Sequence, residues 1–170
     1  RTDLNTVLAE TLSLLNTEKT KSSEIIFQES FTPDIPLLML DRNHIKQVFI
    51  NILMNSIQAM PKGGVITIQT RYRKEEDEVE ITFADTGIGM AEDELLLVFQ
   101  PFYTTKDKGL GLGFNIIHKI VKEHGGYILL SSKKGEGTEI KLSFPVSPKT
   151  ANMDTHNNVI ALSDTIVIND

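Results

Sequence analysis

The sequence predicts an α+β fold, a two-layer α/β sandwich with a mostly antiparallel sheet. Three segments carry apolar residues at helical spacing and end at prolines, glycines or polar residues. Other segments alternate polar and apolar residues and are joined in pairs by short polar turns, as antiparallel hairpins are. The chain has 170 residues, 40% of them hydrophobic and 24% charged, which suffices for one domain with its own core.

The three expected helices each have a recognisable start or stop. Asp3 is a plausible N-cap of the first helix, which fades near Lys19. Asp41 caps the second helix, and Pro61 together with the glycines that follow it ends that helix. The third helix covers residues 111–124 and ends at two consecutive glycines.

The expected strands are short apolar or alternating segments between polar flanks. They cover residues 24–28, 37–40, 65–73, 79–83, 127–132 and 138–144. An acidic run joins two of them and is expected to form a solvated hairpin turn. This run consists of Glu75, Glu76, Asp77 and Glu78.

The character of the chain changes after Pro145. Residues 147–158 are polar and rich in turn formers, which is typical of a linker or a disordered tail. Residues 159–162 and 165–168 are apolar enough to dock as strands. We therefore expect one domain over residues 1–145 and a tail over 146–170 whose role is open.

The composition excludes several classes of protein. The net charge of −6 argues against a surface for nucleic acid. Since no run of about 18 apolar residues is present, the sequence predicts no transmembrane span. The absence of cysteine excludes disulfides and is compatible with a cytoplasmic location. The first residue is Arg1 rather than Met, from which we expect a piece of a longer protein, with any membrane anchor in the missing part.

A stripe of amides is the most informative feature of the second helix. Gln47, Asn51, Asn55 and Gln58 follow one another at i, i+4, i+8 and i+11, so they share one narrow face. The rest of the circumference is apolar, which predicts a buried helix. An unpaired buried amide costs about 1–3 kcal/mol. The stripe is therefore interpreted as the floor of a binding site.

The segment Asp85-Thr86-Gly87-Ile88-Gly89 follows directly on an expected strand. A carboxylate at a strand end can accept hydrogen bonds from an exocyclic amine, and glycines let the backbone approach a ligand closely. The alternative for this segment is an ordinary tight turn from a strand to a helix.

A second glycine cluster, residues 109–113, opens the third expected helix. Backbone N–H groups at a helix N-terminus can bind phosphate, although a flexible loop is an equal alternative. Between the two glycine segments lie aromatic residues that could stack on a base or form a hydrophobic hinge. Lys106 and Lys108 could reach phosphate oxygens or could only increase solubility.

Taken in order, these segments resemble the catalytic, ATP-binding domain of a sensor histidine kinase, within the GHKL superfamily (gyrase, chaperone, histidine kinase, mismatch repair). The resemblance is to the nitrogen-regulator and sporulation-type kinases. The matching segments are an asparagine box (47–64), a first glycine box (85–89), a phenylalanine box (99–106), a second glycine box (109–113) and a final Gly135, Gly137, Thr138. The resemblance implies the Bergerat fold, in which helices cover one face of the mixed sheet.

The resemblance also implies a role for each matching residue, with ATP and Mg²⁺ as cofactors. Asp85 would accept a hydrogen bond from the adenine amino group, with Thr138 nearby. Asn55 would bind Mg²⁺ through its side-chain oxygen, and Asn51 would help to hold the ion or the phosphates, so that both amides are catalytic. The remaining nucleotide-binding residues, including a lid over the triphosphate, would be Gly87, Gly89, Phe102, Lys106, Lys108, Gly109, Leu110, Gly111, Leu112 and Gly113. Leu110 departs from the usual second glycine box, which has a small polar residue there.

Asn51 also bears on the reaction. The hydrolysing members of the superfamily have a glutamate at this position, and an asparagine cannot act as a general base. The resemblance therefore favours phosphoryl transfer to a protein histidine over hydrolysis, followed by transfer to a response regulator. None of the chain's four histidines has the acceptor pattern, so we expect the acceptor on a helical domain upstream. Two alternatives stay open, namely a serine kinase of the anti-sigma type and a docking module without catalysis.

Overall fold

The computed structural model describes residues 1–15, 24–98, 113–147, 158–162 and 165–169. Its elements are α1 (Leu4–Leu15), β1 (Ile25–Phe31), α3 (Arg42–Gln58), β2 (Gly64–Arg73), β3 (Glu78–Asp85), α4 (Glu92–Leu97), α5 (Gly113–Glu123), β4 (Tyr127–Lys133), β5 (Gly137–Pro145), β6 (Asn158–Leu162) and β7 (Thr165–Asn169). None of the helices in this part of the chain is both long and apolar enough to cross a membrane.

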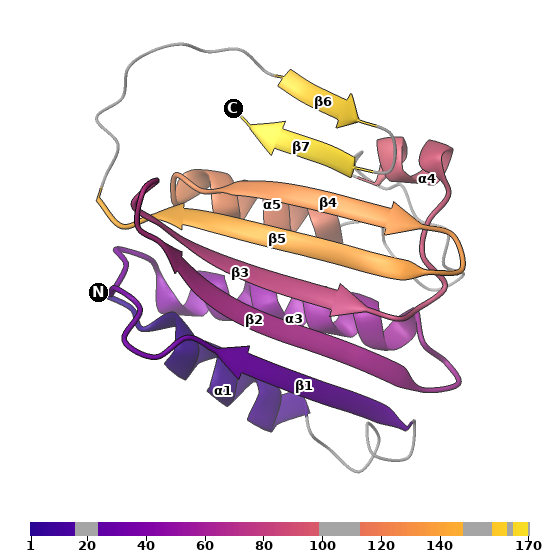
Figure 1. The fold of residues 1–170 in the computed structure, drawn as a ribbon, viewed down its shortest axis with the longest axis horizontal. Coiled ribbons are helices and arrows are strands. Elements are labelled where there is room, and N and C mark those ends of the chain that lie inside the picture. Colours follow the sequence, from indigo (N-terminus) through magenta and orange to yellow (C-terminus); the bar gives the residue numbers. More distant parts are fainter. Residues whose placement is uncertain (16–23, 99–112, 148–157, 163–164, 170) are drawn as a thin grey trace.

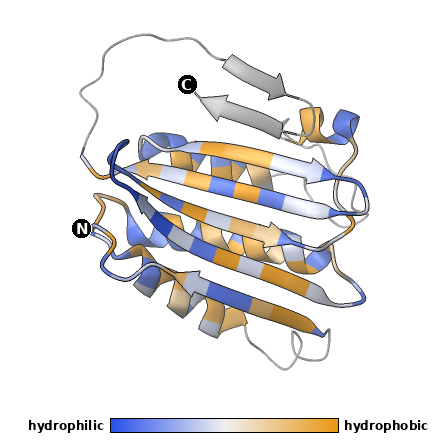
Figure 2. Cartoon of the chain, viewed as in Figure 1, coloured by the Kyte–Doolittle hydropathy of each residue, from blue (hydrophilic) through white to orange (hydrophobic). Residues whose placement is uncertain are grey.

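One mixed sheet and a layer of helices make up the fold. The sheet has the strand order β1-β2-β3-β5-β4-β7-β6, and only β1 and β2 pair in parallel. Helices α1, α3 and α5 lie on one face of the sheet and leave the other face open (Figure 1). Apolar and polar residues alternate along β3 and β5 (Figure 2), because successive side chains point to opposite faces. The predicted two-layer, mostly antiparallel α+β fold is confirmed.

Helix α3 provides the centre of the layer of helices. The Asp41 carboxylate caps it by accepting hydrogen bonds from the backbone N–H groups of Asn43 and His44, as predicted. Its sheet-facing residues are buried, and the Phe49 ring packs on the Phe83 ring of β3 at a centroid separation of 5.6 Å. The other side of α3 is more open, since Met54 is 38% exposed. The prediction of a buried helix therefore holds for its sheet-facing side only, because a helix lying on a sheet exposes its outer side.

Two of the sequence-based assignments are corrected by the structure. Residues 37–40 form no strand, and among the described residues their only ladder contact is an isolated bridge between Leu38 and Thr2. Glu78 does not lie in a solvated turn, because it begins β3 and is 4% exposed. The hydroxyl of Tyr127 donates to its carboxylate at 2.9 Å, which explains how an acidic residue is tolerated there.

The sequence analysis also missed α4, whose six residues are too few to show a helical period. The Glu94 side chain accepts a hydrogen bond from the backbone N–H of Ala91 at 2.8 Å and so stabilises the start of this helix.

The two apolar segments near the C-terminus form strands, as predicted. β6 and β7 pair with each other, and β7 pairs with β4. The described residues after 157 thus continue the sheet, whereas most of the segment expected to be a linker lies outside the described residues. The domain boundary at residue 145 stays a prediction.

The turn between β4 and β5 provides a test of local packing. Gly135 and Gly137 both have positive φ angles, +84° and +110°. A Cβ at Gly135 would meet nothing within 4 Å, whereas a Cβ at Gly137 would lie 1.9 Å from the carbonyl oxygen of Asp85. We expect Gly135→Ala to lower the free energy of unfolding by about 1 kcal/mol from backbone strain alone. Gly137→Ala should lower it by about 3 kcal/mol because the clash is added. Urea denaturation measures both, and equal losses would contradict this account of the turn.

Candidate functional site

The end of β3, the start of β5 and the end of β4 lie side by side near α4, on the right in Figure 1. Asp85 at the end of β3 is paired with Thr138 at the start of β5, and Thr138 is paired with Ser132 of β4. Paired residues point to the same face of a sheet. Asp85 lies on the same face of β3 as Ile81 and Phe83, because residues two apart in a strand point the same way. Ile81 and Phe83 belong to the core, so this face is the one that the helices cover.

The carboxylate of Asp85 is buried and surrounded by hydrogen-bond donors. The Asp85 residue is 9% exposed. Its Oδ2 accepts from the Ser56 hydroxyl of α3 at 2.8 Å, and its Oδ1 accepts from the backbone N–H of Gly87 at 2.9 Å. Desolvation raises the pKa of Asp85 above its usual range, and the hydrogen bonds from Ser56, Gly87 and the Thr138 backbone partly offset the rise. The Asp85 carboxylate is therefore a hydrogen-bond acceptor buried in the largely apolar layer between the sheet and the helices.

The loop after β3 contacts α3 on one side and the β4–β5 turn on the other. A Cβ at Gly87 would lie 2.8 Å from the Ala59 Cβ, and a Cβ at Gly89 would lie 2.0 Å from the carbonyl oxygen of Lys133. The backbone N–H of Ile88 donates to Ala59 at 3.1 Å. Both predicted glycines are thus required for close packing, and they place the loop directly beside Asp85.

Thr138 belongs to a second small network of hydrogen bonds. Its hydroxyl lies 2.9 Å from the Ser132 hydroxyl. The Ser132 hydroxyl also donates to the carbonyl oxygen of Gly137 at 3.0 Å and accepts from the backbone N–H of Met90 at 2.9 Å. Each of the two predicted adenine-binding residues is therefore hydrogen-bonded to a buried serine, Asp85 to Ser56 and Thr138 to Ser132.

The amide stripe of α3 divides into an inner pair and two outer residues. Asn51 and Asn55 are half-buried, whereas Gln47 and Gln58 are exposed, so only the inner pair can form the floor of a site. The Nδ2 atom of Asn51 is buried and has no hydrogen-bond partner among the described residues. A Cβ at Gly113, the first residue of α5, would lie 3.5 Å from Nδ2 of Asn55. The end of the second glycine box thus lies against this amide, as expected for one site.

The other predicted site residues cannot be placed. Phe102, Lys106, Lys108, Gly109, Leu110, Gly111 and Leu112 lie outside the described residues. The predicted lid over the triphosphate therefore stays a prediction, with Gly113 as its one described member.

Sequence reasoning missed Ser56 and Ser132. Ser56 carried a signal, because it continues the apolar row of α3 through Ile45, Phe49 and Ile52, where a hydroxyl needs a partner. Ser132 carried none, since its role depends on a turn and a loop that are distant in the sequence.

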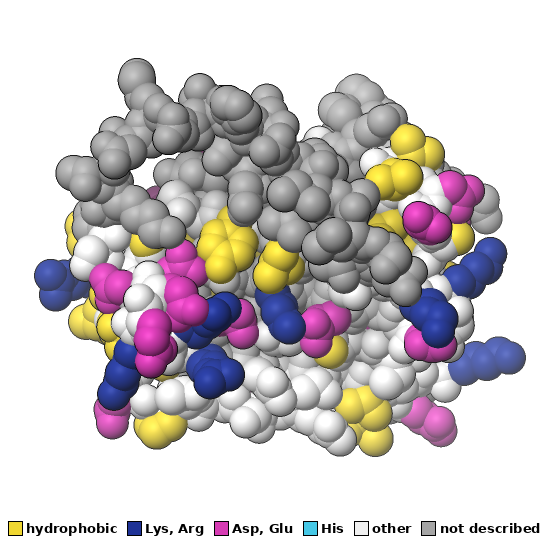
Figure 3. All heavy atoms as spheres, turned by 45° about the horizontal axis from the view of Figure 1, so that its top comes forward, with side chains coloured by type: hydrophobic (Ala, Val, Ile, Leu, Met, Phe, Trp, Pro, Cys, Tyr) yellow, Lys and Arg dark blue, Asp and Glu magenta, His cyan; other side chains and the backbone are white. Residues whose placement is uncertain are grey.

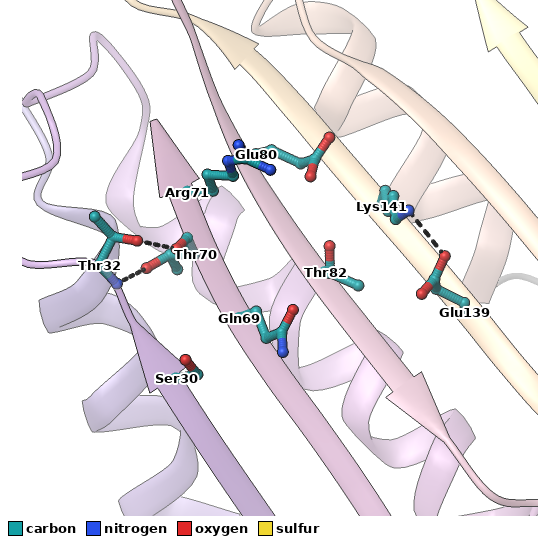
Figure 4. Close-up of a pocket in the computed structure, with 9 residues that line it drawn as sticks. All are labelled: Ser30, Thr32, Gln69, Thr70, Arg71, Glu80, Thr82, Glu139 and Lys141. Atoms are coloured by element: carbon teal, nitrogen blue, oxygen red, sulfur yellow. Dashed lines mark hydrogen bonds and ion pairs between the residues drawn. The ribbon is translucent and has the colours of Figure 1, made fainter. Parts of the chain in front are cut away.

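A hollow on the open face of the sheet lies apart from this site (Figure 4). It is lined by Ser30, Thr32, Gln69, Thr70, Arg71, Glu80, Thr82, Glu139 and Lys141. Acidic and basic side chains share the lining, and Lys141 pairs with Glu139 at 3.0 Å. The same mixture of charges extends over the visible face in Figure 3. Asp85 points to the opposite face of the sheet, so the hollow is not part of the predicted site.

Comparison with known proteins gives a consistent result. Residues 40–148 match the family described as histidine kinase-, DNA gyrase B-, and HSP90-like ATPase. Sporulation kinase E of Bacillus subtilis is 42% identical over 140 residues, which are 82% of this chain and 19% of that protein. Sensor histidine kinase ZraS of Escherichia coli K12 is 35% identical over 145 residues, 85% of this chain and 30% of that protein. The chain spans only about a fifth to a third of the length of such curated relatives.

A solved structure of the catalytic domain of histidine kinase ThkA superposes with a TM-score of 0.76 and 30% identity. The superposition covers 87% of this chain and 95% of that domain. The fold is therefore that of the catalytic domain of histidine kinases. The chain belongs to the histidine kinase-, DNA gyrase B- and HSP90-like ATPase family, as a catalytic domain of the sensor histidine kinase type.

The hydrogen bond from Ser56 to Asp85 gives a pH-dependent prediction. Because the folded pKa of Asp85 is raised, the stability that its protonated form provides is lost as the pH rises through that pKa. Ser56→Ala removes a donor to the ionised carboxylate, a bond worth about 1.5–3 kcal/mol. The variant should therefore raise the pKa of Asp85 further and lose more stability at pH 7 than below that pKa. NMR titration of the Asp85 carboxyl and denaturation at both pH values measure this. A pKa unchanged in Ser56→Ala would contradict it.

Proposed function

We propose that this domain binds Mg-ATP and transfers the γ-phosphoryl group to a histidine on a separate helical domain of the same sensor kinase. The phosphoryl group would then pass to an aspartate of a response regulator. The observation that carries this proposal is the juxtaposition of Gly113 with Asn55, which brings the start of α5 to the amide pair of α3. A relative, ThkA, has been crystallised in complex with the response regulator protein TrrA, which supports a regulator as partner. The reaction would take place in the cytoplasm.

The described residues fit a magnesium nucleotide. Asn51 has a buried amide nitrogen without a hydrogen bond in the described part of the chain, a state that costs about 1–3 kcal/mol unless a ligand satisfies it. Amide oxygens of Asn51 and Asn55 are hard ligands of the kind that Mg²⁺ accepts together with phosphate oxygens and water. Bound there, Mg²⁺ supplies neutralisation of the phosphate charge. Asp85 offers an acceptor to the adenine amino group at the other end of the site.

Asn51 supports transfer rather than hydrolysis. It stands four residues before Asn55, where the hydrolysing relatives are expected to have a glutamate that activates water. An amide cannot take a proton from water, so the domain lacks this base at that position. The neutral imidazole of an acceptor histidine is itself a nucleophile. The contribution of the domain is therefore to orient the triphosphate through Asn51, Asn55 and the start of α5.

Substitution of Asn55 tests the proposal in the whole protein that contains this domain. Asn55→Ala should abolish the transfer of label from γ-labelled ATP, because the metal would lose one of its two proposed protein ligands. The matched control is Asn43→Ala, an exposed asparagine in the first turn of the same helix, which should keep full transfer. Labelling that is acid-labile and base-stable identifies phosphohistidine.

Three other results would contradict the proposal. Acid-stable label would indicate a serine kinase. Transfer retained in Asn55→Ala would exclude the metal role of this residue. Calorimetry that detects no ATP binding to the wild-type domain, with or without Mg²⁺, would indicate a docking module.

A further inference from the structure

The Ser132 hydroxyl has a single proton and three polar neighbours. The backbone N–H of Met90 can only donate, so Ser132 accepts from it at 2.9 Å. The carbonyl oxygen of Gly137 can only accept, so Ser132 donates its proton there, at 3.0 Å. The remaining neighbour is the Thr138 hydroxyl at 2.9 Å. With the Ser132 proton already used, this bond forms only if Thr138 donates to Ser132.

This proton count gives the Thr138 hydroxyl a defined polarity. Its proton points at Ser132, away from the space beside Asp85, and only its lone pairs remain for a ligand. Ser132 is 6% exposed, so no bulk water competes for these bonds. Thr138 is therefore presented as an acceptor although a free threonine hydroxyl can act in both ways.

Asp85 is restricted in the same sense. An ionised carboxylate has about four acceptor sites. Three donors already contact this one: the Ser56 hydroxyl, the Gly87 N–H and the Thr138 backbone. Ser56 lies on α3 and is itself 5% exposed, so its hydroxyl is a buried donor. About one acceptor direction of Asp85 is left, next to the acceptor of Thr138.

We propose that Ser56 and Ser132 are positioning residues that make Asp85 and Thr138 a pair of acceptors only, and so select purine nucleotides with a 6-amino group over those with a 6-keto group. The inference rests on the proposed function, because it assumes that the base lies at Asp85. An amino group donates two hydrogens and satisfies such a pair. A keto oxygen would face two acceptors and leave buried polar groups unpaired, the situation in which binding sites discriminate most strongly.

The two serines act on different partners. Without Ser132, the Thr138 hydroxyl could rotate and donate to a keto oxygen, so the nucleotide with this group would gain a bond. Without Ser56, one oxygen of Asp85 would lose its fixed donor, and the carboxylate could turn from the amino group or take up a proton. Both changes reduce the preference for the amino group without altering the shape of the base pocket by more than one oxygen atom.

Calorimetry with ATP and inosine triphosphate on the 170-residue chain tests the proposal. We expect the ratio of the two affinities to fall about tenfold in Ser132→Ala, in line with one hydrogen bond gained or lost. Ser132→Thr, which keeps a hydroxyl, should restore the ratio. Ser56→Ala should lower it several-fold, chiefly by weakening ATP binding. Ser143→Ala is the matched control, because Ser143 is a serine 1% exposed near the other end of β5, and its ratio should equal that of the wild type.

The outcomes separate this inference from the proposed function. If the wild type binds neither nucleotide, the proposed function is wrong. If the wild type binds ATP but the ratio is the same in Ser132→Ala as in the wild type, the inference is overturned and the function stands. A change in Ser132→Ala without one in Ser56→Ala would remove Ser56 from the inference. If Ser132→Ala does not fold, Thr138→Val replaces it, and an unchanged ratio in that variant would also overturn the inference.

Discussion

The buried carboxylate of Asp85 is the interaction on which the rest of this site depends. An ionised carboxylate is costly to bury unless donors surround it. Its donors come from three separate parts of the chain, namely Ser56 of α3, Gly87 of the following loop and Thr138 of β5. Satisfying this one side chain therefore requires the helix layer, the loop and the sheet to meet at one place. The same place is where a nucleotide base would be recognised.

The glycines around Asp85 allow the helix, the loop and the turn to pack closely against one another. Gly87 lies against Ala59 at the end of α3, Gly89 against the backbone of Lys133, and Gly137 against the backbone of Asp85. A side chain at any of them would separate the loop, the helix or the turn that contact Asp85. Glycine motifs of this kind are often interpreted as ligand cradles alone. Here they also permit the close packing that keeps the carboxylate buried and its donors within hydrogen-bond distance.

The sequence predicted the elements with a clear period or cap, such as α3 after Asp41. It also singled out Asn51 and Asn55, which are half-buried on α3, and their binding role stays a prediction. It could not predict contacts that depend on tertiary pairing. Glu78 belongs to an acidic run, yet a hydroxyl on β4 makes its burial tolerable. Residues 37–40 have the apolar character of a strand, but in the described part of the chain their backbone forms only an isolated bridge, between Leu38 and Thr2. Ser132 acquires its role from Met90 and Gly137, and no local pattern records that proximity.

We propose that Asp85 and the pair Asn51 and Asn55 bind the two ends of one magnesium nucleotide. A crystal structure of this chain with Mg²⁺ and a non-hydrolysable ATP analogue tests it most directly. We expect the adenine amino group within hydrogen-bond distance of the Asp85 carboxylate and the metal bound to the side-chain oxygen of Asn55. A nucleotide bound in the hollow on the open face of the sheet, with both asparagines far from its phosphates, would contradict the account.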